Sequence, residues 1–166
     1  MKRILVLSLA LSVALIGVAC GTKEATKVDT PKAEEKVAEK PKEESKYAFP
    51  NSTEKGKGEI SVQTESGDSA KGQTPVLFAG KDAVLIQVGY TLENFQGDKE
   101  VFLYVNKKFL ETTQAGEMMQ GSLPLEGELL KPNQYTVTAV QFADNDPKKG
   151  EVIEYHEAKF EVKASQ

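Results

Sequence analysis

The chain has 166 residues, with 21 Lys plus Arg against 25 Asp plus Glu and a formal net charge of −4. This length allows one domain with additional segments. The acidic balance argues against nucleic acid as a partner, because phosphate recognition needs a basic surface. The single cysteine excludes an internal disulfide framework.

The N-terminus has the composition of an export signal. Lys2 and Arg3 are followed by about 16 apolar or small residues without charge, ending at Ala19; this run is short for a membrane-spanning helix. It closes with Gly17-Val-Ala-Cys20-Gly21, which resembles the lipobox of bacterial lipoproteins. The resemblance implies that residues 1–19 are removed as a signal peptide and that the Cys20 thiol carries a diacylglycerol.

The resemblance also implies a location. Diacylglycerol and palmitate-type chains would insert into the lipid bilayer and hold the mature chain on the extracytoplasmic face of a bacterial cell membrane, without a transmembrane span. Two alternatives stay open, an ordinary signal peptide cut near Ala19 and a plain anchor helix. Removing the signal takes away two basic residues and leaves a net charge of −6, which argues against a domain lying flat on anionic lipid.

Residues 20–46 are expected to form a disordered tether after Cys20. The stretch from Thr22 to Lys46 has seven Lys, seven acidic residues and only Ala and Val as apolar ones, so it buries too little surface to offset its ordering entropy. A partner-binding charge tract is the alternative reading.

From residue 47 to 166 the sequence pattern changes to short alternating segments separated by turn residues, which predicts one all-β domain. The expected strands are residues 59–64, 75–79, 83–92, 100–105, 108–112, 122–125, 135–142 and 151–163. Asn106-Lys107 is expected to turn a hairpin, residues 114–119 to form a single helical turn, and the last strand to contain a bulge near His156-Glu157, where its apolar phase changes. About seven or eight such strands favour a sandwich over a barrel or an α/β fold.

The segment Leu130-Lys-Pro132-Asn-Gln-Tyr135 resembles the tyrosine-corner pattern of immunoglobulin-like and fibronectin-III-like sandwiches. Asn133 stands where glycine is usual, and asparagine is the next-best residue for the left-handed conformation. The resemblance implies that the Tyr135 hydroxyl bonds to backbone a few residues upstream. It also implies a single immunoglobulin-like β-sandwich that acts as a non-catalytic module of the cell envelope.

Catalytic and metal-binding residue types are sparse. Nucleophilic chemistry needs a base beside the nucleophile, yet the only histidine, His156, reads as a surface strand residue and the only cysteine, Cys20, is expected to be lipidated. We therefore expect no enzyme and no cofactor. Asp144 and Asp146 resemble the calcium linkers of cadherin-like sandwiches, so calcium is the candidate metal; the alternative is a polar turn between the last two strands.

The alternation of two strands predicts a partner-binding surface. If Val101, Leu103 and Val105 face the core, then Phe102 and Tyr104 face out; if Tyr135, Val137 and Ala139 face the core, then Val140 and Phe142 face out. An immunoglobulin-like strand order makes these two strands neighbours, so the four outward residues would form one apolar patch. Such patches mark partner sites and aromatic residues anchor them. Two alternatives stay open: a reversed register, and a patch covered by residues 47–50.

These features favour a lipid-anchored module whose sandwich binds a protein or glycan of the envelope or surface. An accessory or exclusion-type subunit of an envelope complex is the alternative. A solute-binding lipoprotein is disfavoured, because about 120 residues leave little room for a two-lobed cleft.

Overall fold

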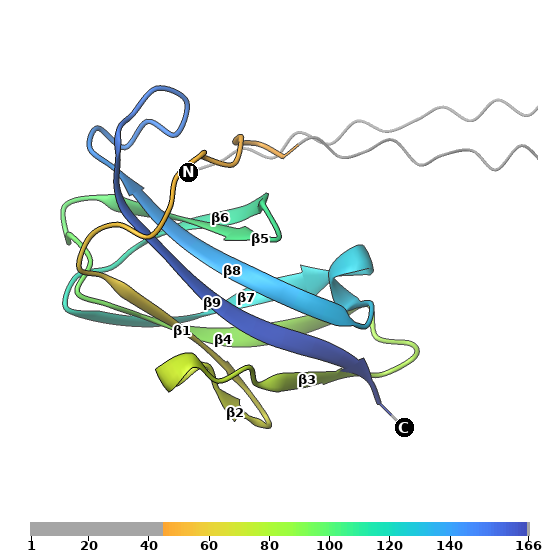
Figure 1. Ribbon diagram of the computed structural model, residues 1–166. Helices are drawn as coiled ribbons and strands as arrows, with labels where there is room; N and C mark the ends of the chain where they lie inside the picture. Colours follow the sequence, from red (N-terminus) through yellow and green to blue (C-terminus); the bar gives the residue numbers. More distant parts are fainter. Residues whose placement is uncertain (1–44, 166) are drawn as a thin grey trace, which may run out of the picture. The chain divides into compact units, whose positions relative to one another are not determined.

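The computed structural model describes residues 45–165, which form two β-sheets packed as a sandwich (Figure 1). The first sheet has the order β2-β1-β4-β7, with β1 at Glu59–Thr64, β2 at Gly67–Asp68, β4 at Leu85–Glu93 and β7 at Met118–Glu126. The second has the order β3-β9-β8-β5-β6, with β3 at Val76–Ala79, β5 at Glu100–Val105, β6 at Lys108–Gln114, β8 at Asn133–Phe142 and β9 at Val152–Ala164. Two 3₁₀ turns, η1 (Ala70–Gly72) and η2 (Gly127–Leu130), complete the elements.

The strand order makes the domain an immunoglobulin-like β-sandwich, as the sequence predicted. β1, β4 and β7 take the places of strands A, B and E, while β5, β8 and β9 take those of C, F and G. β6 extends the second sheet beside β5, and β3 adds to the opposite edge as a parallel partner of β9. Within residues 45–165 no helix is long and apolar enough to cross a membrane.

The core lies between the sheets and follows from the two-residue period of the strands. In β5, Val101, Leu103 and Val105 face inward and are fully buried. Tyr135 and Val137 of β8 face the same core. This confirms the register that the sequence predicted for both strands.

The tyrosine corner is formed as its pattern implied. The Tyr135 hydroxyl lies 2.7 Å from the carbonyl oxygen of Glu128 and 2.9 Å from that of Lys131, so it bonds to the chain just upstream. Pro132 stands between η2 and β8, where its fixed φ suits the turn. Burial, and then the nearby Glu128 charge, raise the pKa of the Tyr135 phenol.

Two local predictions had opposite outcomes. Asn106 and Lys107 both have positive φ, 45° and 69°, and join β5 to β6 as the predicted tight hairpin. The helical turn expected at residues 114–119 is wrong, because β6 runs to Gln114 and β7 begins at Met118. Ala115 is buried in the link between them.

The predicted signal peptide, Cys20 and all of the tether before residue 45 lie outside the described residues.

Candidate functional site

Residues 45–58, which we call the strap, precede β1 and cross the outer face of β5 and β9 (Figure 1). The Tyr47 ring packs edge-on against Phe102, with centroids 5.6 Å apart, and the Phe49 ring packs in the same way against Tyr104 at 5.3 Å. The Tyr104 hydroxyl donates to the carbonyl of Ala48 at 3.3 Å. The strap is therefore a lid over an apolar sheet face.

This lid corrects the predicted partner-binding surface. The four predicted residues do form one outward-facing aromatic cluster, but they are almost wholly buried: Phe102 2%, Tyr104 0%, Val140 0% and Phe142 2% exposed. The predicted alternation is confirmed, and of the alternatives left open the structure shows the patch covered by residues 47–50. Covering it is favourable because burial removes a large apolar face from water. Burial, and then the charge of Tyr47, raise the pKa of Tyr104 to about 12.

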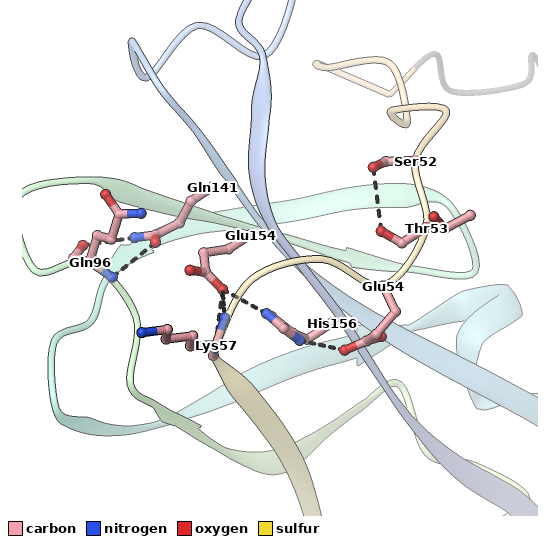
Figure 2. Close-up of polar contacts among 9 residues, drawn as sticks. Ser52, Thr53, Glu54, Lys57, Gln96, Gln141, Glu154 and His156 are labelled. Carbon is pink, nitrogen blue, oxygen red and sulfur yellow. Dashed lines mark hydrogen bonds and ion pairs between the residues drawn. The ribbon is translucent and has the colours of Figure 1, made fainter.

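A polar cluster fixes the C-terminal end of the strap (Figure 2). His156 lies between two carboxylates: Nδ1 is 2.5 Å from Oε1 of Glu54, and Nε2 is 2.7 Å from Oε2 of Glu154. The same Glu154 oxygen accepts the backbone N–H groups of Lys57 and Gly58, each at 2.9 Å. One buried carboxylate thus holds the strap and the histidine together.

The close packing around Glu154 explains a glycine in the strap. Gly56 has φ +100°, and a Cβ there would lie 1.9 Å from the Glu154 carboxylate. Only glycine allows the strap backbone to pass so near while adopting this left-handed conformation.

The hydrogen bonds of His156 determine what it can do chemically. A carboxylate only accepts, and each of the two short contacts therefore needs a proton between nitrogen and oxygen. Both ring nitrogens contact carboxylates and the side chain is 6% exposed. The ring therefore links the strap to β9 and has no nitrogen directed at a substrate.

The placement of His156 corrects two expectations from the sequence. It is 5% exposed and is not a surface residue, and β9 pairs with β8 without interruption through His156 and Glu157. The register shift falls at Ile153 instead, opposite Gln141 and Phe142. The residues of β9 that face inward begin with two polar ones, Glu154 and His156, and only then become apolar. Apolar periodicity alone therefore could not predict that these two face inward.

A second buried polar side chain, Gln141, lies opposite Glu154 on the neighbouring strand β8. Gln141, fully buried on β8, accepts from the Gln96 N–H at 3.0 Å and donates to the carbonyls of Gln96 and Lys99 at 2.8 and 3.0 Å (Figure 2). The neighbouring Phe95 ring packs edge-on against the His156 ring at 5.6 Å. The β4–β5 loop and the strap are therefore held by adjacent strands.

A cleft of about 670 Å³ opens beside His156, between β9 and β1. Its walls come from β9 residues 156–159, the first half of β1, the Ser69–Thr74 segment with η1, and the end of β4. The charged residues of its lining are Glu54, Glu59, Lys71, Glu93, Glu157 and Lys159. Concave sites with converging polar groups are the usual location for ligands, and the sequence did not predict this one, since its lining comes from four separated segments.

The predicted calcium residues lie in the turn between β8 and β9. The Asp144 side chain accepts the N–H of Asp146 at 3.1 Å, and the Asp146 side chain accepts the N–H of Lys148 at 2.8 Å. Among residues 45–165 no group of three or more His, Cys, Asp or Glu side chains is placed to hold a metal ion. Both aspartates form the polar turn that was the alternative reading.

Comparisons with known proteins give little beyond the fold. No protein-family model matches the chain, and no curated protein matches it. Among solved structures, the solution NMR structure of the CARDB domain of a Pyrococcus furiosus protein is similar, with 14% identity and a TM-score of 0.37, over 63% of this chain and 91% of that one.

Proposed function

We propose that this protein is a lipid-anchored extracytoplasmic binding module: Cys20 carries the anchor, residues up to the strap form the tether, and the sandwich binds a partner without chemical turnover. The partner site is the cleft between β9 and β1. The single observation that carries the proposal is this cleft, because the apolar face first expected to bind a partner is already occupied by the strap.

Two features of the cleft support binding over catalysis. The titratable group most suited to acid–base chemistry, His156, has both ring nitrogens bonded to carboxylates. The glutamates and lysines of the lining are exposed except for Glu93, which is partly buried, while the walls come from strands and a short turn. A rigid wall with charged groups at its rim suits recognition of a charged or polar partner.

The anchoring part of the proposal rests on Gly17-Val-Ala-Cys20 and on the charged tract after it. Mass spectrometry of the N-terminal peptide, from the full chain expressed in a bacterium, tests it. We expect a mature terminus at Cys20 with a diacylglycerol mass increment and recovery in the membrane fraction. In the control, Cys20→Ser, we expect neither. A wild-type terminus that is free of acyl groups and secreted would contradict the anchor.

The binding part is tested by photocrosslinking in intact cells. A photoreactive residue at Thr74 lies in the cleft, and one at Lys131 lies after η2, outside the cleft lining. We expect a discrete crosslinked product from position 74 only. The same products from both positions, or none from position 74, would exclude the cleft as the partner site.

A further inference from the structure

One edge of β9 is paired at its two ends and open between them. At one end Lys55 of the strap exchanges backbone hydrogen bonds with Tyr155, at 3.0 and 2.8 Å. At the other end β3 pairs with β9 from Glu161 onward. Between these points residues 156–160 have strand partners only on the β8 side, within the described chain.

The gap follows from the sequence on both sides. Pro75 accepts the Glu161 N–H at 2.9 Å, but it has no N–H of its own, so the parallel ladder cannot continue toward Lys159. At the other side the bridge between Lys55 and Tyr155 is antiparallel, so the strap residues before Lys55 run toward Glu157. They leave the edge there, because Phe49 packs over Tyr104 and Tyr155 on the outer face of the sheet. The opening is therefore built into the fold.

The exposed backbone groups can be identified from the strand period. Tyr155 and Glu161 direct their backbone groups toward this edge, so Glu157 and Lys159, at the same phase, present their N–H and C=O groups to it as well. Two successive rungs of a ladder are thus available. An unpaired edge of this kind is a template for an added strand.

The cleft of about 670 Å³ lies at this edge. Residues 156–159 of β9 form one wall, and Glu59–Ser61 of β1 with the Ser69–Thr74 segment form the other. β1 pairs with β2 only at Gln63 and Thr64, so its first half also has a free edge. Five residues of extended chain, about 17 Å long at 3.3 Å per residue, match the open length of β9.

The charges of the cleft define the occupant. Glu59 and Glu93 lie directly opposite each other across β1 and β4, and both line the cleft. Like charges in this arrangement are destabilising, and no cation of the described residues forms an ion pair with either one. The side chains of Glu157 and Lys159 share the outward phase of Tyr155, where Glu157 accepts the Tyr155 hydroxyl. Among the other charged residues of the lining, Glu54, Glu59 and Glu93 outnumber Lys71, so a basic side chain on the ligand would relieve the repulsion.

We propose that the open edge of β9 at residues 156–160 binds an extended, Lys- or Arg-containing peptide segment of a partner protein, which enters the cleft as an added strand. The proposal rests on the proposed binding function and names its ligand class. Backbone hydrogen bonds to Glu157 and Lys159 supply affinity that does not depend on sequence, and the Glu59–Glu93 pair selects basic side chains.

Selection of a random seven-residue peptide library against the full chain in neutral detergent tests the proposal. We expect enriched peptides to alternate β-forming residues with Lys or Arg. On binding they should slow amide hydrogen exchange at Glu157 and Lys159. The exchange of Ala158, already bonded to β8, should not change.

Two variants of one residue separate strand addition from side-chain contact. Lys159→Pro removes an edge N–H that the fold does not use and should weaken peptide binding at least about tenfold, the equivalent of one lost hydrogen bond. Lys159→Ala keeps that N–H and should change affinity less than about threefold. Melting curves of both variants report whether the fold survives, and the exchange measurement on the unaltered protein stands if proline disturbs it.

The charge argument has its own variant. Glu59→Gln combined with Glu93→Gln should weaken binding about three- to tenfold and flatten its dependence on salt. Peptides that bind equally to the proline variant would overturn the proposal, as would a library without any member binding below about 1 mM. A dimer of the chain that Lys159→Pro dissociates would also overturn it, in favour of a second copy.

These outcomes are distinct from failure of the proposed function. Acylation at Cys20 and crosslinking from position 74 test the anchor and the cleft without reference to peptides. If both hold while peptide selection fails, the module binds another kind of partner in the same cleft.

Discussion

Replacing Glu154 by alanine is the most direct test of how the strap is held. The carboxylate accepts three donors, the N–H groups of Lys57 and Gly58 and Nε2 of His156, and is 5% exposed. Each donor left without an acceptor in a buried site costs about 1–3 kcal/mol, and the three are coupled. We therefore expect Glu154→Ala to lower the free energy of unfolding by about 3–5 kcal/mol, a large share of a typical domain's stability.

Urea unfolding followed by circular dichroism measures this loss on the chain beginning at Gly21. Glu161→Ala is the matched control on the same strand, because that side chain is partly exposed and, within residues 45–165, forms an ion pair with Lys163 alone; it should cost less than about 0.5 kcal/mol. Glu154→Gln, which keeps one acceptor oxygen, should lie between the two. A loss below about 1 kcal/mol for Glu154→Ala would refute the role assigned to the carboxylate.

Three further outcomes follow from the packing. Tyr135→Phe removes the tyrosine-corner hydroxyl and should cost about 1–1.5 kcal/mol, read as a lower melting temperature; an unchanged value would contradict the bonds described. Phe49→Ala should cost about 1.5–3 kcal/mol, since the ring is half-buried against two aromatic rings, and should raise binding of a hydrophobic dye as the outer face opens; a chain that loses stability without added dye binding would argue against a lid. Burial raises the pKa of both Tyr90 and Tyr104 to about 12, so between about pH 10 and 12 the unfolded chain releases phenol protons that the folded chain retains. Stability should fall there by up to about 1.4 kcal/mol per pH unit for each tyrosine, with phenolate absorbance appearing together with unfolding; earlier phenolate absorbance from these two residues would show that they are accessible.

The fold was largely predictable because its signals are local. Pro132 and Tyr135 mark the turn into β8, Asn106 and Lys107 accept the positive φ of a tight hairpin, and alternation in β5 assigns its faces. Each of these depends on a few neighbouring residues. Physical rules about single turns and strands were therefore enough to predict a sandwich.

The candidate site was not predictable, because it depends on contacts between distant segments. Alternation placed Phe102 on the outer face, but it could not decide whether a segment more than 50 residues earlier in the chain covers it. His156 looked like a surface residue because Glu54, which encloses it together with Glu154, lies 102 residues earlier in the chain. Alternation indicates which side of a strand a residue lies on, and only the tertiary structure determines what covers that side.

The strap also determines how a mechanical load would enter the domain. A pull on the chain before Ser45 meets first the bond between the Phe109 N–H and the Ser45 hydroxyl, then the Tyr47 ring, then the Phe49 ring, and only afterwards the Lys55 bridge and the Glu154 carboxylate. Such contacts break one after another, as in unzipping, so little force is needed for each. Under such a load the strap would come away from the sheet face contact by contact before the strands of the two sheets separate.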